Sequence, residues 1–463
     1  MLLSEISKAI NVQLSSSECI DDVSISRVST DTRTLETGDL FVALRGPSFN
    51  GHSYLNEAIN KGCVAAIVDE KNSALEIPQL VVKDTRIALG LMAEAWRMQF
   101  DNLNVIAITG SCGKTTVKEM LAAILSEVAP TLATYGNLNN DIGVPLTLLR
   151  LNASHRFAVV ELGANAMGEI AYTAKLVHPD VAIITNAAAV HVEGFGSISN
   201  VAREKGEIYK CLNEKGVAIV NGDDLNSDSW LKQIKKTGSS LLICSKDIHP
   251  ANNSRHANYW LENVCLTESN AYSYDICSDS NRIHISSALL GFHNVINGLL
   301  VTAAAKSLGV ANDAIQIGLN KVKPASGRLN TISENAFDVL LIDDTYNASP
   351  HSVNAAIDLL STYPNEKILI LGDMGELGEK ADEYHFQVGL KAKEKGVHQV
   401  LAVGQYARDV IAGFGKQGVS FEKQEELINA LADYLKTGMV VLVKGSRSAY
   451  MENVVNAIKE SAA

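Results

Sequence analysis

Residues 104–116 read NVIAITGSCGKTT, and this stretch decides the fold of the middle of the chain. The four apolar residues 105–108 predict a buried strand, and residues 117–128 predict a helix that ends before Pro130. Gly110 and Gly113 lie between these two elements. When a strand, a glycine loop and a helix follow one another in this way, the backbone N–H groups of the loop and the positive end of the helix dipole face the same polyanion. The stretch therefore predicts a nucleotide site in an α/β sheet.

The loop also carries the side chains that nucleotide chemistry needs. Lys114 would supply a point charge to the outer phosphates, and Thr115 a hydroxyl ligand for Mg²⁺. Only Ser111 and Cys112 separate the two glycines, whereas the usual loop has about four residues before its Gly-Lys pair. A glycine turn with a chance lysine is the alternative, but the flanking elements favour a subset of P-loop enzymes. The predicted phosphate-binding residues are Gly110, Ser111, Cys112, Gly113, Lys114, Thr115 and Thr116.

The bulk composition limits the classes of partner. The chain has 463 residues, 46% of them hydrophobic, which suggests about three domains at roughly 150 residues each. A net charge of −12 argues against a nucleic-acid partner or an anionic membrane surface. The seven cysteines show no metal-binding spacing and are expected to be reduced. With no signal-like leader and no long apolar span, we expect a cytoplasmic protein without membrane insertion. We also expect it to be a monomer.

Apolar runs and turns divide the chain into three α/β units. Residues 1–83 carry short strands and form the first domain. Residues 84–322 alternate strand and helix around the phosphate loop, which predicts a parallel sheet. Their polar stretch 240–290 predicts an antiparallel excursion before a helix at 294–308. Residues 323–463 predict a Rossmann-like, doubly wound domain whose site lies at the carboxyl ends of its strands.

Three residues of the central unit are candidates for metal chemistry. Glu161 ends the strand FAVVE and would hold Mg²⁺ near the phosphate loop, or would be a solvated strand-end carboxylate. His191 follows the strand VAIIT in a loop of small residues, where a metal ligand and a structural histidine are equally plausible. Lys205 lies in VAREKGEIYK, which predicts a helix, and by itself it reads as a surface lysine.

Clustered polar residues mark further candidate sites. The amides of YGNLNNDIGVP would bind polar substrate groups or form Asx turns, and those of HNVIN would contact an adenine edge or cap a helix. Polar side chains also follow the strands LLID and VVLV of the third unit, where cations could hold a carboxylate or phosphate. These candidates are Asn137, Asn139, Asn140, Asn294, Asn297, Asp344, Tyr346, Asn347, Lys444 and Arg447.

The sequence resembles the Mur ligases of bacterial cell-wall synthesis, and the resemblance covers essentially the whole chain. It is carried by five motifs in this order: GSCGKTT, the glutamate of FAVVE, the histidine of AAAVHVEG, REKGEI and HNVIN. It implies that Lys205 is carbamylated by CO₂ to give a carboxylate-like metal ligand. It also implies that His191 is the second metal ligand and Glu161 the first acid. Cys112 departs from the family pattern, which usually has Ser or Thr there, and at a helix N-terminus it predicts sensitivity to thiol reagents.

Three stretches resemble one member of that family, the ligase that joins D-alanyl-D-alanine to a UDP-N-acetylmuramoyl tripeptide. They are TDTRTLETGDLFVAL at 30–44, YNASP at 346–350 and GDMGELG at 372–378. The sister ligase that adds a diamino acid usually carries an Asp-Asn-Pro-Arg stretch, which this sequence lacks. That sister ligase, and a P-loop ATPase or regulator without ligase activity, remain the alternatives.

The resemblance implies a mechanism and a role for each domain. ATP would phosphorylate the tripeptide carboxylate, and the amine of the dipeptide would attack the acyl phosphate. Thr115 and Glu161 would hold one Mg²⁺, and His191 and carbamylated Lys205 a second. Closure of the third domain would bring Arg328, Asp344, Tyr346 and Asn347 to the nucleotide. The first domain would bind the UDP-sugar through Thr30, Asp31, Arg33, Gly46 and His52, while Lys444 or Arg447 would meet the dipeptide carboxylate.

Overall fold

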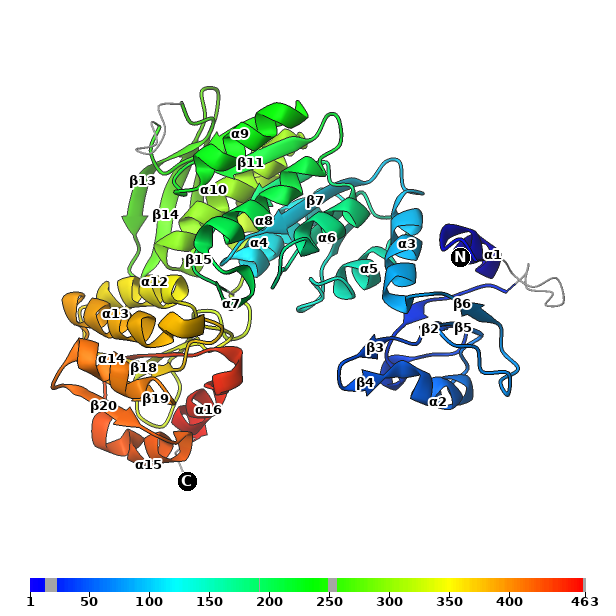
Figure 1. The fold of residues 1–463 in the computed structure, drawn as a ribbon. Helices are drawn as coiled ribbons and strands as arrows, with labels where there is room; N and C mark the ends of the chain where they lie inside the picture. The colour runs from blue at the N-terminus through cyan, green and yellow to red at the C-terminus, as the bar shows by residue number, and fades with distance from the viewer. Residues whose placement is uncertain (13–22, 191, 249–255, 461–463) are drawn as a thin grey trace.

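The computed structural model describes residues 1–12, 23–190, 192–248 and 256–460. Its three domains follow one another along the chain, and the central one lies between the two outer ones (Figure 1). The N-terminal domain is built on a four-stranded parallel sheet in the order β1-β2-β5-β6. Its elements are α1 (Leu3–Ala9), β1 (Val28–Ser29), β2 (Leu40–Val42), the hairpin β3 (Arg45–Gly46) and β4 (Phe49–Asn50), α2 (Leu55–Asn60), β5 (Ala65–Val68) and β6 (Gln79–Val81).

Helix α3 (Thr85–Arg97) joins the N-terminal domain to the central one. Asp84 is its N-cap residue, and the Asp84 side chain accepts hydrogen bonds from two backbone N–H groups of the first turn. Leu89 and Met92 of this helix pack in the N-terminal core, whereas Ala93 packs in a core of the central domain. One helix therefore contributes to both cores, which couples the two domains through packing.

The central domain is built on a six-stranded sheet in the order β12-β11-β10-β7-β9-β8, and all its pairs are parallel. Along β7, Ile106 and Ile108 face one core and Val105 and Ala107 the other, so the strand is buried on both faces. Its elements are β7 (Asn104–Thr109), α4 (Lys114–Ser126), β8 (Thr131–Ala133), α5 (Gly143–Leu148), β9 (Phe157–Glu161), α6 (Glu169–Val177), β10 (Val181–Ile184), α7 (Val192–Phe195), α8 (Ile198–Lys210), β11 (Val217–Asn221), α9 (Ser227–Thr237) and β12 (Ser240–Cys244).

Two expectations for this domain need correction. Helix α4 begins at Lys114 rather than at residue 117, so the lysine and both threonines of the loop lie in its first turn. Strand β12 was expected in an antiparallel excursion but pairs in parallel with β11. The reason is that α9 precedes β12 and returns the chain to the same end of the sheet, as in any βαβ crossover.

The antiparallel sheet is shorter than the predicted stretch 240–290, and it lies beside α10 and α4. It consists of β13 (Trp260–Leu266), β14 (Ala271–Cys277) and β15 (Arg282–Leu290), followed by α10 (Phe292–Ser307) and α11 (Asn312–Lys321). Tyr274 and Ile285 of this sheet pack with Met120 of α4 and Leu299 of α10 in one buried core. The sheet thus covers the face of the central domain opposite to α6 and α8.

The C-terminal domain is a doubly wound domain with the sheet order β16-β17-β21-β18-β19-β20. Only the short pair β16–β17 is antiparallel among the strands described. Its elements are β16 (Asn330–Ile332), β17 (Leu340–Asp344), α12 (Pro350–Ser361), β18 (Lys367–Gly372), α13 (Ala381–Glu394), β19 (Gln399–Val403), α14 (Ala407–Phe414), β20 (Gly418–Phe421), α15 (Gln424–Tyr434), β21 (Val440–Lys444) and α16 (Glu452–Glu460).

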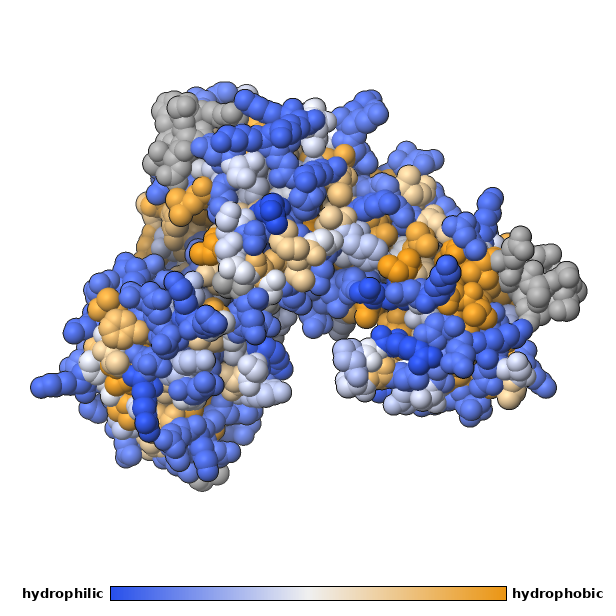
Figure 2. Space-filling view, viewed as in Figure 1, coloured by the Kyte–Doolittle hydropathy of each residue, from blue (hydrophilic) through white to orange (hydrophobic). Residues whose placement is uncertain are grey.

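The two outer domains lie apart on the face shown in Figure 2, with an open space between them below the central domain. The central and C-terminal domains, by contrast, meet at the carboxyl edge of the central sheet, where α12 approaches the phosphate loop (Figure 1). Within the described part of the chain, no helix is long and apolar enough to cross a membrane.

Candidate active site

A cavity of about 740 Å³ lies between the phosphate loop and the C-terminal domain. The loop after β7, Glu161 at the end of β9 and Lys205 on α8 line its central-domain wall. Arg328 and most residues of the segment from Asp344 to Ser352 line the opposite wall. Residues that are far apart in the sequence therefore meet in one cavity, and the central sheet presents its strand ends to it.

The phosphate loop is held in shape by the loop that follows β10. Asn186 Oδ1 accepts a hydrogen bond from the Cys112 N–H at 3.0 Å, and Asn186 Nδ2 donates to the Cys112 carbonyl at 3.0 Å. Thr185 Oγ1 donates to the same carbonyl at 2.6 Å. A Cβ on Gly110 would lie 1.8 Å from Thr185 Oγ1, so only glycine fits there. Asn186 therefore fixes the conformation of the phosphate loop, a role that no motif in the sequence assigns to it.

Lys114 and Glu161 place opposite charges at the head of the cavity. Lys114 Nζ donates to the Gly110 carbonyl at 2.8 Å, and burial lowers the pKa of this amine although the nearby Glu161 opposes the shift. Glu161 is only 2% exposed. Its Oε1 accepts a hydrogen bond from Asn139 Nδ2 at 2.7 Å, while its Oε2 is buried and has no hydrogen-bond partner among the described residues. A buried carboxylate oxygen in that state fits a hard cation.

Lys205 is buried, although its sequence context predicted a surface residue. Its exposed fraction is 3%, and burial together with the charge of Lys114 lowers its pKa to about 7. The preceding residue, Glu204, accepts hydrogen bonds from Gly168 N and Ile170 N at the start of α6. This carboxylate holds α8 against α6 and so fixes the position from which Lys205 enters the cavity.

Three of the four predicted metal ligands line the cavity. His191, the predicted partner of Lys205, lies outside the described residues. Among the residues that are described, no group of three or more His, Cys, Asp and Glu could hold a metal ion. The predicted ligands Thr115, Glu161 and Lys205 all line the cavity, so what the structure supports is their common location.

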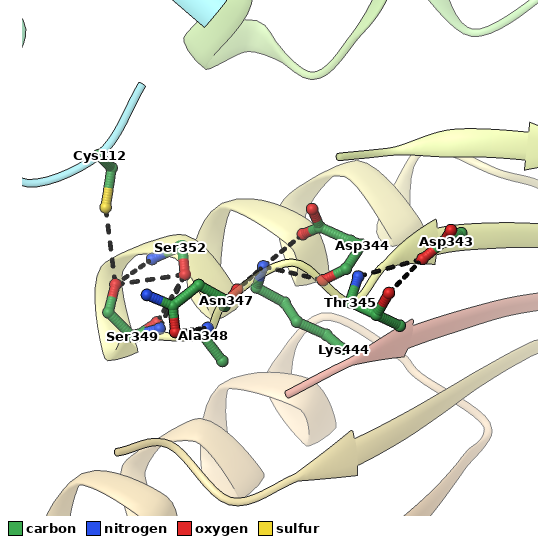
Figure 3. A network of polar contacts seen from close by, with 9 residues as sticks. All are labelled: Cys112, Asp343, Asp344, Thr345, Asn347, Ala348, Ser349, Ser352 and Lys444. Carbon is green, nitrogen blue, oxygen red and sulfur yellow. Dashed lines mark hydrogen bonds and ion pairs between the residues drawn. The ribbon is translucent and has the colours of Figure 1, made fainter. Parts of the chain in front are cut away.

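The C-terminal wall contacts the phosphate loop directly. Arg328 donates to Thr115 Oγ1 at 3.2 Å, and its guanidinium lies 4.1 Å from the centre of the Tyr346 ring. Cys112 Sγ lies 3.6 Å from Ser349 Oγ at the N-terminus of α12 (Figure 3). Ser349 caps this helix and Pro350 opens it, a Ser-Pro signal that could have marked the position in the sequence.

Lys444 lines the C-terminal wall of the cavity and is engaged by neighbouring residues of that wall. Its Nζ lies 2.5 Å from Asp344 Oδ2 and also donates to the carbonyls of Asp344 and Asn347 (Figure 3). Burial raises the pKa of Asp344 although Lys444 opposes the shift. Lys444 therefore ties β21 to the loop after β17. Arg447, the other candidate cation, is 65% exposed, lies 2.9 Å from Glu452 and does not line the cavity.

The predicted amide clusters also come to the cavity wall. Asn140 Oδ1 accepts from Gly143 N, and Asn137 lines the cavity beside Asn139. On α10, Asn297 Nδ2 donates to Asn294 Oδ1.

On the same helix, Asn294 Nδ2 donates to the Leu290 carbonyl. A Cβ on Gly113 would lie 3.1 Å from Asn297 Oδ1, so this amide packs against the phosphate loop. The α10 pair therefore supports the loop; whether it also contacts adenine stays a prediction.

The predicted UDP-sugar residues lie together on the N-terminal domain, separate from the cavity. Asp31 caps a 3₁₀ turn (Thr32–Thr34) and forms an ion pair with Arg33 at 2.7 Å. His52 Nε2 lies 2.9 Å from Asp69 and accepts from its N–H, and burial lowers the pKa of this imidazole. Thr30 adjoins Asp31, and Gly46 lies in the β3–β4 hairpin.

Comparison with known proteins covers all three domains. Residues 24–97 match the Mur ligase family catalytic domain, 108–305 the Mur ligase middle domain and 327–447 the Mur ligase glutamate ligase domain. The UDP-N-acetylmuramoyl-tripeptide–D-alanyl-D-alanine ligase of Escherichia coli is 41% identical over 461 residues, covering 99% of this chain and 98% of the relative.

Solved structures agree over the same length. MurF from Acinetobacter baumannii is 36% identical with a TM-score of 0.92, covering 99% of this chain and 98% of the other. MurF from Thermotoga maritima in complex with ADP is 27% identical with a TM-score of 0.81, covering 95% of this chain and 98% of the other. Because these matches run from the N-terminal sheet to the C-terminal one and include the shortened phosphate loop, this chain belongs to the Mur ligase family.

Proposed function

We propose that this protein is an ATP-dependent ligase that joins D-alanyl-D-alanine to UDP-N-acetylmuramoyl tripeptide, with release of ADP and phosphate. Relatives of that name, similar over their full length, support the substrates, and the ADP-bound neighbour supports the nucleotide. The observation that carries the proposal is the unpartnered, buried Glu161 Oε2 beside Lys114 in a cavity between two domains. The product would be the pentapeptide precursor of peptidoglycan.

The phosphate loop and Arg328 would bind the nucleotide from opposite sides. Backbone N–H groups of the loop and Lys114 would hold the β- and γ-phosphates, because they lie at the N-terminus of α4. Arg328 already reaches Thr115 and would neutralise charge that develops on the transferred phosphoryl group. Binding of both walls to one nucleotide would hold the domains closed and exclude water from the acyl phosphate.

The residues present fit Mg²⁺. Thr115 and Glu161 would hold one ion, and His191 with Lys205 a second, where two divalent ions would neutralise the γ-phosphate and the substrate carboxylate. A lysine can serve as a ligand there only as its carbamate. Its pKa of about 7 supports this modification, because a substantial fraction of the amine is then neutral and can attack CO₂, losing one proton.

The acceptor site would lie between the GDMGELG loop and α7. A Cβ on Gly378 would be 4.0 Å from the Glu193 Cα, so this loop reaches the segment next to His191. The Asp373 carbonyl accepts from Ser446 N, which places the start of the loop beside Arg447. Lys444 is buried in its pair with Asp344, whereas Arg447 is 65% exposed and its pair with Glu452 lies nearer the surface, so Arg447 is the better candidate for the dipeptide carboxylate.

The remaining assignments follow from this chemistry. The N-terminal domain would anchor the UDP end of a long substrate whose peptide end reaches the central cavity. A cytoplasmic location is supported by the need for ATP and a UDP-activated precursor, and we propose a monomer. The predicted boundaries, 1–83, 84–322 and 323–463, would separate these three functions.

The deciding experiment compares acceptors under identical conditions. Purified enzyme and Mg-ATP are incubated with UDP-N-acetylmuramoyl tripeptide and either D-alanyl-D-alanine or D-alanine. A third reaction contains the UDP-N-acetylmuramoyl dipeptide and meso-diaminopimelate. Phosphate release and the mass of the product are measured in each reaction. We expect ligation of D-alanyl-D-alanine and phosphate release only when both substrates are present. Preference for the diamino acid would assign the sister activity, and phosphate release without an acceptor product would indicate a simple ATPase.

A further inference from the structure

The GDMGELG loop, residues 372–378, lies one strand beyond the nucleotide wall of the C-terminal domain. It follows β18, which is the neighbour of β21 in the sheet, and Leu371 at the end of β18 pairs with Lys444 at the end of β21. The chain after β21 runs from Lys444 at the cavity to Arg447. Loops at the carboxyl ends of neighbouring parallel strands lie side by side, so this loop adjoins the one that carries Arg447.

The start of the GDMGELG loop is held by Asp373. Its Oδ2 accepts a hydrogen bond from Gln405 N at 2.8 Å, and its Oδ1 accepts one from Tyr406 N at 3.0 Å. A Cβ on Gly404 would lie 2.4 Å from Asp373 Oδ2, so the carboxylate packs directly against this turn. Asp373 therefore uses its charge to fix the loop.

His385 and two buried side chains hold the rest of the loop. Met374 N donates to His385 Nε2 at 2.9 Å, and His385 Nδ1 lies 2.6 Å from the Ala381 carbonyl, so the proton of the neutral imidazole is on Nδ1. The imidazole stacks on the Tyr406 ring with centroids 4.6 Å apart. Met374 and Leu377 are buried in the core of the domain. The backbone on both sides of the loop tip is therefore fixed.

Glu376 stands at this tip in a strained conformation. Its φ is +61°, in the left-handed region that suits glycine and disfavours a residue with a Cβ. Its side chain is exposed, so packing of that side chain does not account for a glutamate at this position. Strain of this kind persists only where the surrounding structure imposes it, and it is concentrated at sites that hold ligands.

The residues that flank Glu376 contact both sides of the domain interface. A Cβ on Gly375 would lie 3.6 Å from Ser446 Cβ, next to Arg447, whose side chain is 65% exposed. A Cβ on Gly378 would lie 4.0 Å from the Cα of Glu193, which belongs to α7 of the central domain. Glu376 is thus carried between a cationic loop of its own domain and the central domain.

We propose that Glu376 determines specificity for the acceptor by binding the ammonium group of D-alanyl-D-alanine, while Arg447 binds its carboxylate. The acceptor is a zwitterion, so its two ends need one anionic and one cationic partner, and two adjacent loops present exposed side chains of these charges. The need for this carboxylate accounts for a glutamate where glycine would be unstrained. The assignment rests on the proposed ligation, whose acceptor site it defines.

The first experiment removes the charge of Glu376 and keeps its shape. We expect Glu376→Gln to raise KM for D-alanyl-D-alanine about tenfold, since a charge-assisted hydrogen bond is lost, and to leave KM for ATP and for the UDP-N-acetylmuramoyl tripeptide unchanged. Glu379→Gln is the matched control, because Glu379 is also exposed and lies three residues further along. An unchanged KM for the dipeptide in Glu376→Gln, or an equal increase in Glu379→Gln, would overturn the proposal.

A ligand without the amine separates ammonium binding from loop shape. Propionyl-D-alanine is D-alanyl-D-alanine with the amino group replaced by hydrogen, and its inhibition constant against the dipeptide is measured for wild type and Glu376→Gln. We expect the two constants to agree within about twofold, because this ligand has no group for Glu376 to bind. Weakening of propionyl-D-alanine as large as that of the dipeptide would show that residue 376 acts through the loop, and would overturn the proposal.

Glu376→Gly tests the strain, and wild type tests the underlying reaction. We expect the glycine variant to melt at or above the Tm of wild type and to show the same rise in KM for the dipeptide as Glu376→Gln. A lower Tm would contradict the claim that glutamate is strained there. If wild type ligates the dipeptide and KM is insensitive to residue 376, this assignment alone fails. If wild type ligates no D-alanyl-D-alanine, the proposed function fails and the assignment fails with it.

Discussion

Replacement of Lys205 by methionine should separate stability from activity. Lys205→Met keeps a linear side chain of similar volume in a site that is 97% shielded from solvent, since the lysine is 3% exposed. It removes the amine that would become the carbamate ligand. We expect ligation to fall by on the order of 10²–10³, the usual effect of losing a preorganised charge contact in phosphoryl transfer. We also expect the folded state to become more stable.

The gain in stability follows from the pKa of the amine. The value falls from 10.5 to about 7 on folding, so the unfolded chain binds more protons between these two pH values and stability rises with pH across that window. The destabilisation by Lys205 is complete below pH 7 and vanishes above pH 10.5. At one pKa unit per 1.36 kcal/mol, it amounts to about 4 kcal/mol at pH 7.5 and about 1 kcal/mol at pH 10.

The assay is urea unfolding of wild type and Lys205→Met at pH 7.5 and pH 10, without divalent metal and with CO₂ excluded. The difference in unfolding free energy should be largest at pH 7.5. Adding bicarbonate and Mg²⁺ should then stabilise wild type and not the variant, because the carbamate converts a buried amine into an anion near Lys114. A stabilising effect of bicarbonate on the variant would show that it acts elsewhere.

Lys118→Met is the matched control. Lys118 is also 3% exposed, but its amine donates to the Thr134 carbonyl at 2.9 Å and pairs with Glu119. Its replacement should lower the free energy of unfolding by about 1–3 kcal/mol, because a buried carbonyl loses its partner. The reasoning is refuted if Lys205→Met is no more stable than wild type at pH 7.5, or if both variants change stability in the same direction.

Three further predictions concern the two walls of the cavity. Gly110→Ala should weaken ADP binding at least tenfold in calorimetry, since the new methyl would lie 1.8 Å from Thr185 Oγ1; unchanged affinity would mean that the loop adapts. Lys444→Met should lower the free energy of unfolding by about 3–5 kcal/mol, because it leaves the buried Asp344 carboxylate without its partner. Adding Asp344→Asn to this variant should recover most of that loss, and additive losses in the double variant would contradict the pairing. Arg447→Ala should raise KM for D-alanyl-D-alanine about tenfold and leave KM for ATP unchanged, and parallel increases would remove it from the acceptor site.

The architecture was largely readable from the sequence because it rests on local patterns. Apolar runs such as 105–108 and 181–184 become buried parallel strands, and glycines after a strand end open the phosphate loop. The exception in the sheet, β12, has a polar start and short length that are also typical of antiparallel strands. Its parallel pairing depends on the crossover through α9, which the strand itself does not encode.

The residues of the candidate site could be predicted from the sequence only where a motif specifies the backbone conformation. The sequence by itself determined the phosphate loop, with Gly110, Lys114 and Thr115, and placed Glu161 at a strand end beside it, since spacing sets where backbone N–H groups and strand ends lie. Tertiary structure alone decided that Lys205 is buried and that Lys444 pairs with Asp344. Burial and pairing depend on which surfaces meet when domains pack, and the desolvation that shifts a pKa exists only after they have met.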